Sequence, residues 1–201
     1  MTVNNRPLYT RLQSGLITMS DTLASIEKKL AGLLCFAVFA LIIGNVISRS
    51  LRLPVFWIDE LAVYAMIWMA LLAASSAINS KGHIAVTLIT DKLPARPAHL
   101  LRKFTEFVMV SLGITLFALA WRWYDPAGIV SFAGDIAAFS ATSFNFIYTE
   151  PTIATGLPKF VFWLIMPLFS IGLTLHSLAI FFAPTGSREN KMEKRTQKEA
   201  S

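Results

Sequence analysis

Residues 61–80, LAVYAMIWMALLAASSAINS, form an uncharged run between Glu60 and Lys81 that decides the class of the fold. A predominantly apolar run of about 20 residues is long enough to cross a lipid bilayer as an α-helix. Three more uncharged runs cover residues 30–48, 107–121 and 160–187. Only 15% of the 201 residues are charged and 55% are hydrophobic, whereas about a quarter of the residues of a soluble domain are charged. The sequence therefore predicts an all-α integral membrane protein with four transmembrane helices.

The expected spans divide the chain into three parts. Residues 1–29 form a cytoplasmic segment, residues 30–183 form a four-span membrane domain, and residues 184–201 form a charged cytoplasmic tail. The uncharged run of the third span has only 15 residues, about 22 Å of helix against a hydrocarbon core of about 30 Å, so this helix must begin earlier. The spans are expected at about residues 30–49, 58–80, 100–122 and 159–182.

Lysine and arginine are distributed unevenly between the segments that flank the spans. With both termini in the cytoplasm, 14 of these residues lie on the cytoplasmic side and four on the outer side. Basic residues close to spans are retained in the cytoplasm, so the sequence predicts an N-in, C-in topology. The net charge of +6 then reflects contact with an anionic bilayer surface, and nucleic acid is not expected as a partner.

The segment before the first span carries a regular apolar stripe. Spacings of three and four residues place the whole stripe on one face of a helix. We therefore expect an N-terminal amphipathic helix that lies in the membrane interface and runs into the first span, with a soluble tail as the alternative. The stripe consists of Leu8, Leu12, Leu16, Met19, Leu23, Ile26 and Leu30.

The second span begins with charged and aromatic residues and continues with a ridge of small ones. Asp59 and Glu60 follow Trp57, and carboxylates in a first turn stabilise a helix N-terminus. We expect both to cap the helix and to contact a partner at the outer surface. Trp68 needs an acceptor for its indole N–H and is a candidate for a protein–protein face. Small side chains allow close helix packing, either within the chain or against a partner. The ridge consists of Ala70, Ala73, Ala74 and Ala77.

The sequence lacks the motifs that would indicate catalysis. It contains no glycine-rich phosphate loop, no Cys/His metal spacing and no nucleophile elbow, so we expect no enzyme activity, no catalytic residue and no bound metal or cofactor. The four uncharged runs offer no ionisable Asp, Glu, Lys or Arg near the bilayer midplane, where a transported ion would need a charged partner. His83 and His176 approach the same leaflet, so a small haem-binding or redox membrane subunit is the alternative function. Pro167 predicts a distortion in the fourth span.

Residues 56–94, FWIDELAVYAMIWMALLAASSAINSKGHIAVTLITDKLP, resemble the small membrane subunit of the tripartite ATP-independent periplasmic (TRAP) transporters, the DctQ-type or SiaQ-like subunit. Residues 156–167, GLPKFVFWLIMP, also resemble the start of this family's last span. One position departs from the family pattern, because Thr87 stands where an acidic residue is usual. The residues that carry the resemblance are Trp57, Glu60, Trp68, Gly82, His83, Ile84, Leu93 and Pro94.

The resemblance implies a scaffold subunit of a secondary transporter for organic anions, of the carboxylate or sialic acid class. The small subunit would support a large sodium-coupled membrane subunit in the bacterial cytoplasmic (inner) membrane, and a periplasmic substrate-binding protein would dock on the complex. Sodium would bind to the large subunit and not to this chain. The residues expected to face the partners are Trp57, Asp59, Glu60, Trp68, Ala70, Ala73, Ala74, Ala77, Gly82 and His83.

Overall fold

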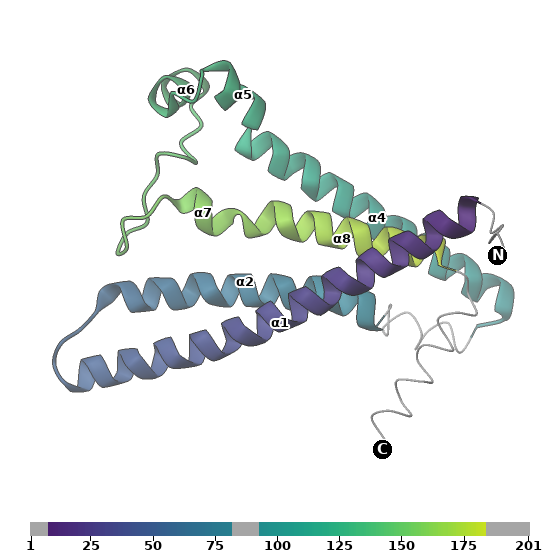
Figure 1. The fold of residues 1–201 in the computed structure, drawn as a ribbon, viewed down its shortest axis with the longest axis horizontal. Helices are drawn as coiled ribbons and strands as arrows, with labels where there is room; N and C mark the ends of the chain where they lie inside the picture. The colour runs from purple at the N-terminus through teal and green to yellow at the C-terminus, as the bar shows by residue number, and fades with distance from the viewer. Residues whose placement is uncertain (1–7, 82–92, 184–201) are drawn as a thin grey trace, which may run out of the picture.

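The computed structural model describes residues 8–81 and 93–183, and its elements there are all α-helices (Figure 1). Four helical segments are long and apolar enough to cross a membrane, which confirms the predicted all-α fold with four spans. These segments are Thr10–Ser50, Phe56–Asn79, Arg96–Ser131 and Lys159–Phe182.

Helix α1, Leu8–Ser50, is a single helix of 43 residues, about 64 Å long. The expected amphipathic segment and the first span are therefore parts of one continuous helix (Figure 1). The apolar stripe of its first half points away from the other helices, since Leu12, Met19 and Ile26 are exposed. The buried side chains come from the opposite face, which carries Ser20 and Glu27. Lipid favours apolar side chains on the outside of a bundle, so polar groups turn toward the neighbouring helices. The location of this segment in the membrane interface stays a prediction.

Helix α2, Phe56–Lys81, returns alongside α1 after a short turn. Arg52 adopts a positive φ of 59° in this turn, and the Leu53 N–H donates to the Ser48 carbonyl at 3.0 Å. The turn is compact enough to hold the two helices antiparallel and in contact (Figure 1).

Helix α8, Ile165–Phe182, lies in the middle of the molecule and contacts α1, α2 and α4, Ala95–Tyr124 (Figure 1). The short helix α7, Lys159–Trp163, precedes α8, and a break at Leu164 separates the two. Pro167 explains the break, because proline has no N–H and its ring excludes the carbonyl four residues earlier. The predicted distortion of the fourth span is confirmed.

The connection between α4 and α7 carries two short helices, α5, Pro126–Ser131, and α6, Ile136–Ser143. Asp125 caps α5 by accepting the Gly128 N–H at 3.0 Å, and Asp135 caps α6 by accepting two backbone N–H groups. This connection lies at the same end of the molecule as the α1–α2 turn (Figure 1). We call the end with residues 51–55 and 125–158 the loop end.

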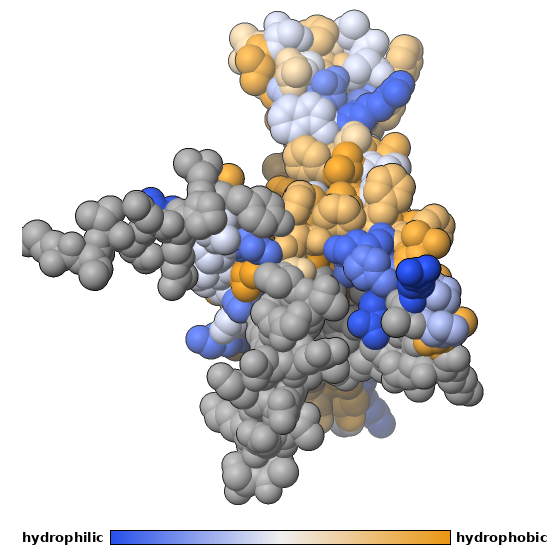
Figure 2. All heavy atoms as spheres, turned by 90° about the vertical axis from the view of Figure 1, so that its right-hand side faces the viewer, coloured by the Kyte–Doolittle hydropathy of each residue, from blue (hydrophilic) through white to orange (hydrophobic). Residues whose placement is uncertain are grey.

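The helices present large apolar side chains to their surroundings. Exposed examples are Phe36 on α1 and Phe104 on α4. Figure 2, which views the end opposite the loop end, shows strongly hydrophilic patches beside the hydrophobic surface of the helices. Apolar surface of this extent fits a bilayer as the surrounding solvent.

Candidate functional site

Glu60 holds a loop at the loop end through three backbone hydrogen bonds. Its Oε1 accepts the Ile153 N–H at 2.8 Å, and its Oε2 accepts the N–H groups of Ala154 at 2.9 Å and Thr155 at 2.8 Å. Consecutive N–H groups that converge in this way form a concave site for an anion. The carboxylate on the first turns of α2 fills this site and fixes the loop to the helix.

The loop that Glu60 holds is closed at its base and hydrophobic at its tip. The Thr152 N–H donates to the Leu157 carbonyl at 2.8 Å, and the Lys159 N–H donates to the Glu150 carbonyl at 2.9 Å. Ile153 at the tip is 95% exposed. A fixed loop with an apolar tip is suited to contact another protein or the membrane surface.

Asp59 makes a different connection, to α1. Its Oδ2 accepts a hydrogen bond from Arg49 Nη2 at 2.6 Å, and its Oδ1 accepts one from the Asn45 amide. The Arg49 Nε also donates to Asn45 Oδ1 at 3.2 Å, so the three side chains form one cluster. Asp59 thus joins the ends of α1 and α2, while Trp57 beside it is exposed.

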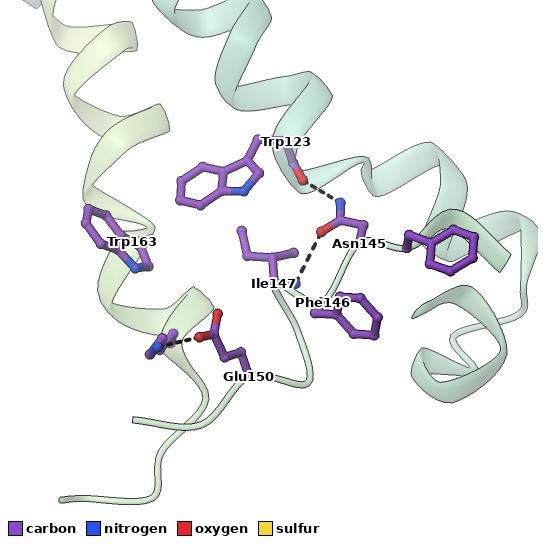
Figure 3. Close-up of a pocket in the computed structure, with 8 residues that line it drawn as sticks. Trp123, Asn145, Phe146, Ile147, Glu150 and Trp163 are labelled. Atoms are coloured by element: carbon purple, nitrogen blue, oxygen red, sulfur yellow. Dashed lines mark hydrogen bonds and ion pairs between the residues drawn. The ribbon is translucent and has the colours of Figure 1, made fainter. Parts of the chain in front are cut away.

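A cavity of about 410 Å³ opens at the loop end between α4, α7 and the connection (Figure 3). The rings of Trp123 and Trp163 meet edge to face there, with centroids 5.9 Å apart. Asn145 shapes the chain on the other side by donating to the Trp123 carbonyl at 2.8 Å and accepting the Ile147 N–H at 3.2 Å (Figure 3). The full lining consists of Trp123, Phe144, Asn145, Phe146, Ile147, Glu150, Lys159 and Trp163.

Tyr148 ties the connection to the end of α4 beside this cavity. Its hydroxyl donates to the Tyr124 carbonyl at 2.6 Å. Burial, together with the nearby Asp125 carboxylate, raises the pKa of Tyr148, so the phenol stays protonated and remains a donor. The loop end is therefore a fixed structure held by Glu60, Asn145 and Tyr148.

Trp68 finds its hydrogen-bond partner inside the chain. Its indole Nε1–H donates to the Phe162 carbonyl at 2.7 Å, and its side chain packs against the core around Ile165. Tyr64, one turn earlier, stacks on the Phe162 ring with centroids 4.1 Å apart. Trp68 thus joins α2 to α7, and the unpaired donor that suggested a partner face is satisfied internally.

The alanine ridge of α2 is exposed along its whole length. Its four members, Ala70, Ala73, Ala74 and Ala77, are all exposed, so the ridge is not buried by another part of the described chain. Its use as a contact with a partner stays a prediction. Gly82 and His83, the remaining residues expected to face a partner, lie outside the described residues.

A chain of buried polar side chains crosses three helices on the far side of the bundle from the loop end. His176 of α8 is completely buried, and Glu27 of α1 is 4% exposed. His176 Nε2 lies 3.0 Å from Glu27 Oε2, and His176 Nδ1 lies 2.7 Å from Ser20 Oγ. The hydroxyl of Ser75, on α2, donates to Glu27 Oε1 at 2.8 Å. Asn79, also on α2, donates to Ser20 Oγ at 2.7 Å.

Residues 38–185 match the family described as the DctQ component of the tripartite ATP-independent periplasmic transporters. The chain belongs to this family. The match covers 148 of the 201 residues, about three quarters of this chain. No solved structure matches it.

Curated relatives of this DctQ component carry TRAP transporter names. The sialic acid TRAP transporter permease protein SiaT of Haemophilus influenzae is 26% identical over 79% of this chain and 27% of its own length. A putative TRAP transporter small permease protein from another strain of that species is 26% identical, over 59% of this chain and 84% of its own length. The C4-dicarboxylate TRAP transporter small permease protein DctQ of Vibrio cholerae is 30% identical, over 60% of this chain and 53% of its own length.

These relatives differ in length, and the chain spans only about a quarter of SiaT and about half of the V. cholerae protein. Together with the four apolar helices, the family assignment makes this DctQ component a TRAP small permease subunit and a multi-pass protein of the bacterial inner membrane. It is a transporter component and not an enzyme.

The histidines of the DctQ component do not support the haem alternative. Both ring nitrogens of His176 are engaged, one with Ser20 and the other with Glu27, so neither is free to coordinate iron. His99 is exposed on α4, and His83 lies outside the described residues. The family assignment gives no support to a haem or redox subunit either.

The Ser20–His176–Glu27 chain has the residue types of a hydrolytic triad but not the setting of one. Ser20 is 1% exposed, and its oxygen already accepts the Asn79 amide, so no substrate can reach it. A structural role fits the burial better.

Sequence reasoning missed Glu27, because the apolar stripe directs attention to the other face of α1. A signal was available in the spacing of small and polar residues. Ser20, Ala24, Glu27 and Ala31 are spaced four, three and four residues apart, so they lie on one face of the helix. A face of small and polar residues packs against other helices in preference to lipid.

Proposed function

We propose that this DctQ component is the scaffold of a three-part transporter. It supports a large membrane subunit in the bilayer and presents its loop end to a periplasmic substrate-binding protein. The exposed alanine ridge of α2 carries this proposal, because it is a flat strip on a molecule that otherwise presents large apolar side chains. A helix of the large subunit can approach such a strip closely and gain van der Waals contacts that lipid chains do not provide.

The loop end is the proposed docking place for the binding protein. Glu60 fixes the 150–159 loop, and this loop carries Ile153 at its tip. Phe144, with a positive φ of 54°, is also highly exposed on the same end. This backbone conformation ends α6, where the Phe144 N–H donates to the Ser140 carbonyl, and it places the exposed ring just after the helix.

The proposed cargo is an organic anion, and the relatives named for sialic acid and C4-dicarboxylates support this class. Sodium coupling and substrate binding are assigned to the large subunit. The buried carboxylates of the small subunit, Glu27 and Glu106, already have partners in His176 and Lys103. Neither is arranged with the open coordination that a transported ion requires.

Reconstitution in proteoliposomes tests this division of labour. Vesicles that contain only the small subunit should show no sodium-dependent uptake of labelled sialic acid or C4-dicarboxylate above empty vesicles. Uptake should appear when the large subunit and the binding protein from the same transporter are added. Uptake by the small subunit alone, abolished by a substitution within one of its helices, would contradict the scaffold function.

A further inference from the structure

Among the described residues, the Glu27–His176 pair differs from a second ion pair that holds a buried carboxylate, Lys103–Glu106. Glu106 on α4 is 3% exposed and has the ammonium group of Lys103 at 2.9 Å. Glu27 is equally buried, but its basic partner is an imidazole at 3.0 Å. A lysine carries its own positive charge, whereas a histidine is charged only after it binds a proton. The net charge of the Glu27–His176 pair therefore depends on one proton.

Without an extra proton, the contacts form a one-way series of hydrogen bonds. Asn79 donates to Ser20 Oγ, the Ser20 hydroxyl donates to His176 Nδ1, and His176 Nε2–H donates to Glu27. The Ser75 hydroxyl donates to the other oxygen of Glu27. Every donor and acceptor in this series is matched, but the group carries one negative charge.

With one proton added, the same atoms remain in contact. The proton sits on His176 Nδ1, the imidazolium then donates to both Ser20 Oγ and Glu27, and the Ser20 oxygen accepts from His176 and Asn79 with its two lone pairs. The proton comes from water, and no bond other than O–H and N–H is broken or formed. The group is now electrically neutral, with an ion pair inside it.

Burial determines which of the two protonation states of the Glu27–His176 pair has the lower free energy. A single uncompensated charge in a low-dielectric interior costs several kcal/mol, and a paired charge costs much less. Among the ion pairs of the described residues, the basic group at Glu27 is His176. From α2, neutral Ser75 contacts Glu27 and neutral Asn79 contacts Ser20, and the other buried polar residues of α8 are Ser170 and Ser177.

The charged groups on the neighbouring elements have other positions or partners. Asp21 of α1 accepts the Asn79 amide at 3.0 Å. Lys28 follows Glu27 on α1 but is exposed. On α4, Lys103 is bound to Glu106 and to the Phe181 carbonyl. Arg102 of α4 is half-buried, and its Nε has no hydrogen-bond partner among the described residues.

We infer that the Glu27–His176 pair is a proton-binding site that holds one proton at neutral pH and so fixes α1 to α8. Gly172 of α8 supports this role, because a Cβ there would lie 2.5 Å from Ser75 Oγ and 2.7 Å from Glu27 Oε1. The helices therefore approach closely enough at this point to exclude a bridging side chain. The bound proton belongs to the scaffold and is distinct from the coupling ion of transport.

Two spectroscopic measurements on the full-length subunit in lipid bilayers test the inference. Solid-state NMR of ¹⁵N-labelled histidine should show His176 protonated on both nitrogens at neutral pH. If the proton instead resides on the carboxylate, infrared spectra should show the C=O stretch of a protonated carboxyl group that Glu27→Gln removes. Either result demonstrates the bound proton, and exposed His99 provides a second histidine signal in the same sample.

Two variants complete the test. Glu27→Gln preserves the shape of the side chain and should shift His176 to its neutral form at neutral pH. Glu106→Gln, the matched control, removes an equally buried carboxylate and should leave the His176 signal unchanged. A wild-type protein with a neutral His176 and no protonated carboxyl band at neutral pH would overturn the inference without any variant. An imidazolium signal that persists unchanged in Glu27→Gln would also overturn it.

Discussion

Two adjacent carboxylates at the start of α2 serve different partners. Asp59 pairs with the Arg49 side chain of α1, whereas Glu60 accepts three backbone N–H groups from residues 153–155. The helix dipole favours carboxylates near a helix N-terminus, and Asp59 lies in the first turn of α2 with Glu60 directly after it. Successive residues of a helix point in directions about 100° apart, and this rotation sends the two carboxylates to different neighbours.

Glu60→Gln tests the loop clamp. Glutamine retains one acceptor oxygen but turns an NH₂ group toward backbone N–H donors, so at least one of the three hydrogen bonds is lost. We expect faster hydrogen–deuterium exchange at the amides of Ile153, Ala154 and Thr155, measured by mass spectrometry on the purified subunit. Asp59→Asn is the control, and it should leave these amides unchanged. Equal exchange in the wild type and Glu60→Gln would show that the clamp does not hold the loop.

At the scale of helices, the contact between α4 and α8 depends on a glycine. A Cβ at Gly113 would lie 2.5 Å from Thr174 Oγ1, 3.0 Å from its backbone nitrogen and 3.1 Å from its Cα. Two of these atoms belong to the backbone, so a larger residue has to push the helices apart. Gly113 thus sets the distance between α4 and the central helix.

Gly113→Ala should therefore destabilise the subunit by about 1–3 kcal/mol, the usual cost of overpacking. The thermal unfolding midpoint in detergent should fall. Gly44→Ala is the matched control, because nothing lies within 4 Å of the Cβ that it adds and alanine favours a helix more than glycine does. Its midpoint should stay the same or rise, and an equal decrease in both variants would contradict the packing argument.

The exposed ridge of α2 makes a second prediction at this scale. Ala73→Leu adds bulk to the strip that the large subunit is proposed to contact, so co-purification with that subunit should weaken several-fold. Ala118→Leu makes the same change at an exposed position of α4 and should leave co-purification unchanged. Equal recovery of both variants would place the interface elsewhere.

The sequence predicts those elements that depend on local pattern. Long uncharged runs fix the four spans, and Pro167 fixes the break in the fourth. The cluster of Glu27 and His176 could not be predicted, because these residues are 149 positions apart and meet only when α1 crosses α8. The hydrogen-bond acceptor of Trp68 could not be predicted for the same reason, because the Phe162 carbonyl lies 94 positions away in the sequence. A distant acceptor of this kind cannot be read from helical spacing, and a contact of Trp68 with a partner stays a prediction.

For the molecule as a whole, the two ends of the bundle differ in their number of basic residues. The loop end and the helix turns that lead into it carry acidic residues that cap helices or hold loops, and their described basic residues number four: Arg49, Arg52, Arg122 and Lys159. The opposite end carries Arg11, Lys28, Lys29, Lys81, Arg96, Arg102 and Lys103 in the described part alone. The hydrophobic surface between the ends faces lipid, so the charged ends lie at the two membrane surfaces. The difference in charge between the ends therefore determines which end faces which side of the membrane.

The asymmetry predicts that the loop end faces the periplasm, since basic residues beside spans are retained in the cytoplasm. A reporter enzyme that is active only in the periplasm should therefore be active when it is inserted after Gly134 and inactive when it is fused after Ser201. Gly134 is a suitable site, because its φ of +83° places it in a turn and no atom lies within 4 Å of an added Cβ. A cytoplasm-active reporter at the same two positions should give the opposite pattern. Periplasmic activity after Ser201 would reverse the topology and would also move the proposed docking loop around Ile153 away from any periplasmic binding protein.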